Sequence, residues 1–182
     1  MRSWSKVVLF AVALGAASLT GLEEARAASC SAAEASEMVR LRAELGRLVG
    51  KNQHKGAVAT FEKMLVLGKQ KCEIKPDDYK LAAAAARNYG DIADAIEWSN
   101  AGGVPSDAAE FATRFGQVKI SEKAGDLVKD SGLPFMPDER AALALVQEEV
   151  KATGKFTGYL PLGTYKLGTK SFEVRTSGVT KV

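Results

Sequence analysis

The chain has 182 residues, of which 25 are lysine or arginine and 22 are aspartate or glutamate, giving a formal net charge of +3 at neutral pH. This length suits one domain or two small ones. A charge so close to balance favours neither a nucleic-acid-binding protein nor one that acts on strongly acidic substrates.

The first 27 residues have the pattern of a secretory signal peptide. Arg2 and Lys6 are basic, an apolar run follows from Val7 to Leu22, and the segment ends in small residues at Ala25 and Ala27. The apolar run is shorter than the ~20 residues that a spanning helix needs. We therefore expect cleavage near Ala27, a periplasmic or extracellular mature protein and no transmembrane segment in it. A retained membrane anchor is the alternative.

The chain contains two cysteines, Cys30 and Cys72, and both follow the predicted signal peptide. An even number of cysteines in an exported chain predicts a disulfide, and here only one intramolecular pairing exists. Two free thiols are one alternative. A lipoprotein acylated at Cys30 is another, but Ala27 stands where such proteins carry a branched apolar residue.

Capping residues and apolar spacing predict five helices in the first two thirds of the chain. Ser31 and Glu34 form a capping box at the start of the first helix. Pro76 suits the first turn of the third helix, and Gly90 suits its end. The predicted helices cover residues 31–49, 55–68, 76–90, 91–100 and 106–115.

The second helices of the two predicted hairpins look related, since aligning Ala57 with Ala95 gives a period of about 38 residues. Together with Leu45-Gly46, this pattern resembles the tetratricopeptide repeat over residues 31–101. The resemblance implies antiparallel helical hairpins whose first helices line a concave binding surface. A short turn between the first two helices places the start of one beside the end of the other. A Cys30–Cys72 disulfide would join these two ends.

From Gln117 onward the apolar pattern changes to an alternation typical of strands. The predicted elements are a strand around 117–121, a second around 126–129, a helix over 138–151 and a hairpin that turns at 168–169. Glycine at the first turn position fits a type II′ turn, and in that register Tyr165 faces Phe172. The Leu160-to-Tyr165 segment resembles the closing hairpin of PEGA-type β domains of bacterial envelope proteins.

We therefore expect an α+β fold, in which antiparallel, tetratricopeptide-like helical hairpins precede a small β-rich module with one helix. The expected organisation is a signal peptide over residues 1–27, a helical repeat domain over 28–115 and a β-rich module over 116–182.

Few residues suggest catalysis. His54 is the only histidine, and we expect it in a surface turn. Asp77-Asp78 and Glu148-Glu149 are adjacent pairs, and neighbouring residues on a helix point in different directions. We predict no catalytic residues, no metal site and no cofactor, and therefore a protein that is not an enzyme.

Four basic residues predict a binding surface instead. Arg40 and Arg47 are seven residues apart on the first helix, and Lys80 and Arg87 repeat this spacing on the third. The tetratricopeptide resemblance places all four on or near the concave groove, where they would bind an acidic peptide or a chain terminus. Ordinary solvated charges are the alternative. The predicted function is non-catalytic protein binding in the periplasm or cell envelope.

The C-terminal part is also basic, with six lysines or arginines and one acid, Glu173, in residues 151–182. The basic residues are Lys151, Lys155, Lys166, Lys170, Arg175 and Lys181. The alternative function is therefore a structural module that binds anionic envelope polymer or a lipid surface through the C-terminal hairpin. Lysines that merely prevent edge-to-edge strand pairing would give the same pattern.

Overall fold

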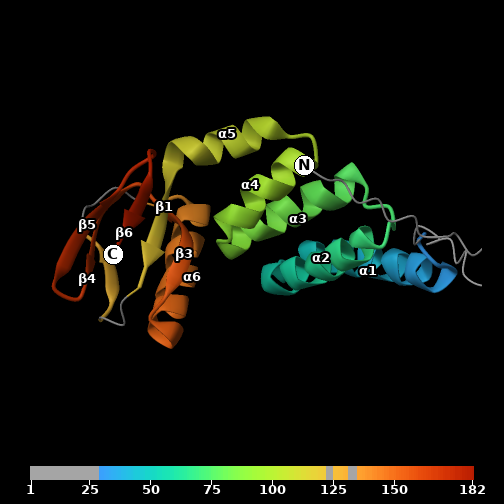
Figure 1. The fold of residues 1–182 in the computed structure, drawn as a ribbon, viewed down its shortest axis with the longest axis horizontal. Coiled ribbons are helices and arrows are strands. Elements are labelled where there is room, and N and C mark those ends of the chain that lie inside the picture. Colours follow the sequence, from blue (N-terminus) through green and yellow to red (C-terminus); the bar gives the residue numbers. More distant parts are fainter. Residues whose placement is uncertain (1–28, 122–124, 131–134) are drawn as a thin grey trace, which may run out of the picture.

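The computed structural model describes residues 29–121, 125–130 and 135–182, so the predicted signal peptide lies outside the described residues. Helices α1 to α5 come first, and the strands follow with α6 between β2 and β3 (Figure 1). The helices are α1 (Ala32–Gly50), α2 (His54–Lys69), α3 (Pro76–Tyr89), α4 (Ile92–Ala101), α5 (Pro105–Arg114) and α6 (Pro137–Thr153). The strands are β1 (Phe115–Ile120), β2 (Leu127–Lys129), β3 (Phe156–Pro161), β4 (Gly163–Leu167), β5 (Lys170–Val174) and β6 (Val179–Lys181).

The helix ends follow from local capping chemistry. The Ser31 side chain accepts a hydrogen bond from the Glu34 backbone, and the Glu34 carboxylate accepts one from the Ser31 backbone. These two bonds satisfy amide groups that have no partner within α1. α3 starts with Pro76 and ends at Gly90, whose φ of 97° is a conformation that glycine adopts without strain.

α1 and α2 form one hairpin, and α3 and α4 form the next (Figure 1). Phe61 of α2 lies at their junction, with ring centroids 5.1 Å from Tyr79 of α3 and 4.8 Å from Trp98 of α4. Both contacts are edge-to-face, one of the arrangements that aromatic rings prefer. The buried face of α3 is built of alanines, which lets its neighbours pack closely.

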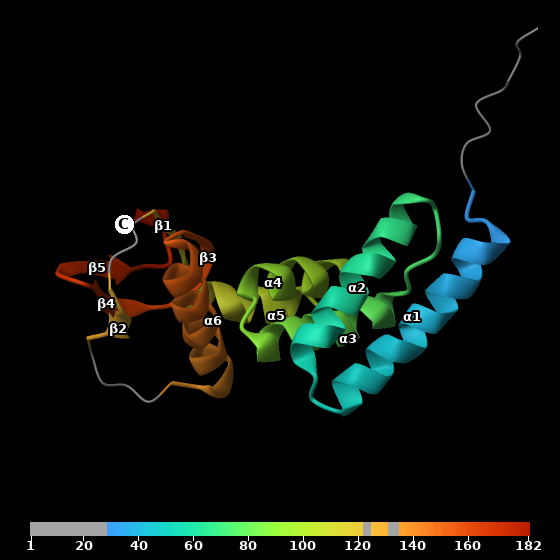
Figure 2. The same cartoon turned by 90° about the horizontal axis from the view of Figure 1, so that it is seen from below.

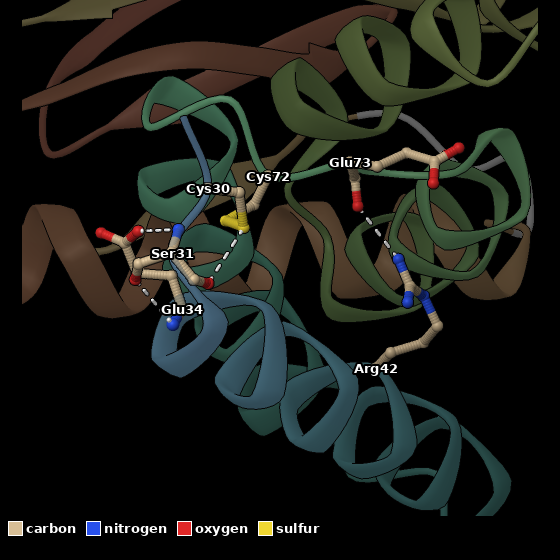
Figure 3. Close-up of a disulfide and its surroundings, with 6 residues drawn as sticks. All are labelled: Cys30, Ser31, Glu34, Arg42, Cys72 and Glu73. Carbon is tan, nitrogen blue, oxygen red and sulfur yellow. Dashed lines mark hydrogen bonds between the residues drawn. A yellow bond between two sulfur atoms is a disulfide. The ribbon is translucent and has the colours of Figure 1, made fainter. Parts of the chain in front are cut away.

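A charged pair also connects the two hairpins. The guanidinium of Arg42 on α1 lies 2.8 Å from the carboxylate of Asp78 on α3, and Asp78 is buried. Arg42 also donates to the backbone oxygen of Glu73, in the connection that leads into α3 (Figure 3). Asp78 in addition accepts from the backbone of Lys75 at the start of α3. The register between α1 and α3 is therefore set by polar contacts as well as by apolar packing.

The strands form two three-stranded sheets with the orders β3-β1-β6 and β2-β4-β5. In the first sheet β1 pairs antiparallel with β3 and parallel with β6. In the second, Tyr165 of β4 pairs with Phe172 of β5, and their rings stack 5.7 Å apart. This confirms the predicted register of the C-terminal hairpin.

α6 lies between the strands and the helical hairpins, as both views show (Figures 1 and 2). Val146 and Val150 of α6 belong to the same buried cluster as the inward-facing residues of both sheets. Ala142, near the other end of α6, belongs instead to the core of the helical hairpins. α6 therefore takes part in both cores and joins them.

The predicted α+β fold, with helical hairpins followed by a small β-rich module containing one helix, is confirmed. β1 begins at Phe115, directly after the last residue of α5, so no linker separates α5 from β1. β3 and β6 were not predicted as strands, and both pair with β1. In the described part of the chain, no helix combines the length and the apolar character needed to span a membrane.

The predicted disulfide is present, since the Cys30 and Cys72 sulfurs are bonded (Figure 3). It joins the residue before the N-cap of α1 to the segment that follows α2, so it closes the open end of the first hairpin. Cys72 is buried against the hairpin core, to which Cys30 also contributes.

Removal of this disulfide in a Cys30→Ser/Cys72→Ser variant will destabilise the protein. A chain-entropy estimate for the sequence separation of 42 residues gives about 4 kcal/mol. For a protein of this size we expect the melting temperature to fall by about 10 °C in a thermal scan. Addition of reductant to the wild type should produce the same shift and should leave the double variant unchanged. Equal melting temperatures for both proteins would contradict a stabilising role.

Gly90 marks a close approach between α3 and α6. A Cβ at this position would lie 2.4 Å from the backbone carbon and oxygen of Ala141, far inside contact distance. Gly103 has a similarly positive φ of 76°, but a Cβ there would meet no atom within 4 Å. The two glycines therefore share a conformation and differ in their surroundings.

We expect Gly90→Ala to destabilise the protein more than Gly103→Ala. The left-handed conformation costs each alanine about 1 kcal/mol. Gly90→Ala must also separate two packed backbones, which adds about 1–3 kcal/mol. Denaturant unfolding of the two variants measures the difference directly. Equal losses in both would show that α3 and α6 do not pack tightly here.

Candidate functional site

Two of the four predicted groove residues come together. Lys80 and Arg87 are two helical turns apart on α3 and line a hollow of about 100 Å³ between α3 and α5. Ala83 and Ala84 lie between them, and their small side chains leave space for the hollow. The other side is formed by Val104 before α5 and by two α5 residues. The complete lining is Lys80, Ala83, Ala84, Arg87, Ser99, Val104, Asp107 and Phe111.

Arg40 and Arg47 do not line this hollow. Arg42 of α1 contacts Asp78 of α3, and each residue advances about 100° around a helix, so Arg40 and Arg47 lie on the side of α1 turned away from α3. Their side chains are 64% and 45% exposed. Each pairs with the glutamate three residues before it on α1, at 2.6 Å.

The two basic residues of the hollow differ in how firmly they are held. Lys80 pairs with Asp77 at 3.0 Å, but the Asp77 side chain is 84% exposed, and such surface pairs contribute little. Arg87 donates to the buried Asp138 at 3.0 Å, and its guanidinium lies 5.3 Å from the centre of the Phe111 ring. Lys80 is therefore free to exchange its carboxylate partner, whereas Arg87 is fixed.

Arg87 belongs to an ionic cluster that the sequence did not reveal. Arg114, at the end of α5, donates to Asp138 at 2.6 Å, to Glu110 at 2.8 Å and to Glu139 at 3.3 Å. Asp138 and Glu139 lie in the first turn of α6, where acids interact favourably with the helix dipole. Their arginine partners come from α3 and α5, far away in sequence, and a single sequence holds no signal for that pairing.

Two effects act on the Asp138 carboxyl in opposite directions. Burial alone would raise its pKa, but the hydrogen bond and charge of Arg114, together with the charge of Arg87, hold the pKa below its usual value. The same contacts raise the pKa of Arg114. Asp138 and Arg114 therefore remain charged around neutral pH. Their contacts, with that of Arg87 on Asp138, bind α3, α5 and α6 together.

A cluster of acids on and near α4 shows the opposite effect. Partial burial, followed by repulsion from Asp91, Glu62 and Glu97, raises the pKa of Asp94 to about 6. The folded protein therefore binds the proton of the Asp94 carboxyl more tightly than the unfolded chain does. The stabilisation of the fold by protonated Asp94 is lost as the pH rises through about 6. No feature of the described residues indicates that this acidic cluster binds a ligand.

His54 is the first residue of α2 and is half-buried, rather than a residue of an exposed turn. Its Nδ1 is buried without a hydrogen-bond partner among the described residues. It lines an open hollow of about 550 Å³ together with Asn52, Lys55 and Tyr89. No described acid or nucleophile is hydrogen-bonded to it.

One group in the described ranges has the composition of a metal site. The ligand atoms of Cys30, Glu34 and Cys72 lie within 4.8 Å of one another. The two sulfurs, however, are bonded to each other, and the Glu34 carboxylate accepts from the Ser31 backbone at 2.7 Å (Figure 3). The sulfur atoms and the Glu34 carboxylate therefore already take part in structural bonds and are not arranged to bind a metal ion.

The basic C-terminal residues are divided between different places. Within the hairpin, Lys166 pairs with Asp130 at 2.8 Å, and Arg175 pairs with Glu173. Lys155 directly precedes β3, and Lys181 lies on β6, so both belong to the other sheet. The positive charge of this region is thus not concentrated on the hairpin.

Comparisons with known protein families, with curated proteins and with solved structures found no match. The relation to tetratricopeptide repeats and to PEGA domains thus stays a prediction based on sequence.

The ionic cluster predicts an acid-sensitive stability. Replacing a buried, paired carboxylate leaves two arginines without their partner, so Asp138→Asn should cost about 3 kcal/mol near pH 7. Because the pKa of Asp138 is lowered on folding, its contribution is complete above the ordinary aspartate pKa of about 4 and is lost as the pH falls through the folded value.

The stability difference between wild type and Asp138→Asn should therefore narrow below about pH 4 in denaturant titrations. Asp77→Asn is the matched control, because Asp77 is paired but 84% exposed, and it should change the stability by less than about 0.5 kcal/mol. A difference for Asp138→Asn that is independent of pH would show that its charge is not the stabilising feature.

Proposed function

We propose that the protein is an exported, non-catalytic protein-binding scaffold of the periplasm or cell envelope. The observation that carries the proposal is the hollow between α3 and α5, with Lys80 and Arg87 at its edge. We further propose that the partner is an acidic peptide or a chain terminus that docks in this hollow.

The chemistry of the hollow supports such a partner. Its lining includes Ala83, Ala84 and Phe111, which suits one apolar side chain of a peptide. Lys80 lines the same hollow and exchanges Asp77 for a partner carboxylate at little cost. One buried apolar anchor beside a charge-assisted contact is a common arrangement in peptide recognition.

The architecture also supports binding. The first helices of the two hairpins, α1 and α3, lie beside each other, and α5 forms the side of the hollow opposite α3. The disulfide and the Arg42–Asp78 pair hold α1 and α3 in register, so the surface exists before a partner arrives. A preformed surface loses less conformational entropy on binding. The disulfide also agrees with an oxidising compartment.

A site-specific photocrosslinking experiment tests this function. A photoreactive side chain replaces Ala84, which is exposed in the hollow, or Ala43, which is exposed on α1 outside it. We expect Ala84 to yield a discrete crosslinked product in the envelope fraction and Ala43 not to. Equal products from both positions would contradict docking in the hollow.

Charge reversal then tests the role of Lys80. Lys80→Glu should reduce the Ala84 crosslink at least ten-fold, because a partner carboxylate would meet a carboxylate. Lys63→Glu, an exposed change on α2, makes the same change in net charge and should leave the product unchanged. A crosslink that survives Lys80→Glu at full yield would exclude an acidic partner.

A further inference from the structure

The outer face of the β3-β1-β6 sheet has an unusual charge distribution. In β1, Gln117 and Lys119 are exposed while their neighbours are buried, so they point outward. β6 pairs with β1 in a register that places Val179 beside Gln117 and Lys181 beside Lys119. Both β6 residues are also exposed.

Lys119 and Lys181 are thus like charges at paired positions on neighbouring strands, an arrangement that destabilises a sheet. Lys155 adds a third positive charge, because it precedes β3 opposite the end of β1. None of the three forms an ion pair with a carboxylate in residues 29–121, 125–130 or 135–182. This part of the described surface is therefore suited to an external anion.

The same face continues into a hollow of about 350 Å³ with a mixed lining, bounded on the other side by α4 and α5, where the lining is apolar. This volume lies within the range of small-molecule sites. Gln117, Tyr159 and Val179 form the sheet side, together with Thr176 and Gly178 from the segment before β6. The helix side is apolar, with contributions from Ile96, Ala108 and Ala112, and Phe115 at the start of β1 lies beside them. Val179 is 47% exposed, so apolar surface remains uncovered here.

This hollow and the paired lysines are close together. Val179 and Lys181 are two residues apart on one strand and face the same side, which separates them by about 7 Å. The geometry points to a binding site for a small amphiphilic anion, whose alkyl chain occupies the hollow and whose acidic head group contacts Lys119 and Lys181. This site is separate from the proposed peptide hollow, because no residue lines both.

Calorimetric titration of the purified protein with decanoate, below its micelle concentration, tests the proposal. We expect one decanoate to bind saturably and the uncharged 1-decanol to bind at least ten-fold more weakly. Acetate should not bind at the same concentrations. Decyl phosphate, compared with decanoate, shows which acidic head group is preferred. Failure of decanoate and decyl phosphate to bind, or equal affinity for decanol, would overturn the proposal.

Two sets of variants locate the site. A Lys119→Gln/Lys181→Gln double variant should bind decanoate at least ten-fold more weakly than the wild type does. Its affinity for decanol should equal that of the wild type. Ala112→Phe should fill the hollow and abolish both, whereas Ala109→Phe, exposed on the same helix outside the hollow, should bind normally. Thermal scans establish that each variant is folded. Unchanged decanoate affinity in the double variant or in folded Ala112→Phe would refute the assignment.

Discussion

The structure depends on one buried carboxylate. Asp138 opens α6, and it accepts hydrogen bonds from Arg87 of α3 and Arg114 of α5. Transferring a charge from water to the protein interior costs several kcal/mol, so this arrangement is favourable only while both arginines are in place. The cluster therefore fixes the relative positions of three helices. Since α6 also packs against the strands, the β-rich module is fixed with them.

The other stabilising features act around this point. Gly90 allows the end of α3 to approach α6 more closely than a side chain would permit. At the opposite end, two helical hairpins are fewer than the three or so repeats that usually make a stable solenoid. The disulfide closes the free end of the first hairpin, and α6 covers the exposed end of the second. The short stack is thus closed on both sides by different means.

The sequence predicted those features that depend on nearby residues. Ser31 with Glu34 predicted the start of α1, and Gly168 predicted the turn that pairs Tyr165 with Phe172. The disulfide followed from antiparallel packing of neighbouring helices, which requires only a short turn.

Features that depend on distant pairing were not predicted. β6 contains three residues of little apolar character, and it becomes a strand because β1, more than fifty residues earlier, offers it a free edge. Spacing placed Lys80 with Arg87 and Arg40 with Arg47 on common helix faces. It did not show which face lies against a neighbour, and only the first pair lines the hollow. The arginine partners of Asp138 were hidden for the same reason.

α5 connects the two proposed sites. It contributes Asp107 and Phe111 to the peptide hollow and Ala108 and Ala112 to the hollow beside the sheet. The helix has ten residues, too few to be stable in isolation, so its position is determined by its surroundings. Arg114 at its end is held by Asp138, and Phe111 packs against the next ring at Phe115. Any coupling between the two sites must therefore act through the position of α5, and by thermodynamic linkage it would be equal in both directions. The same ionic cluster that supports the fold would then determine how strongly one ligand affects the other.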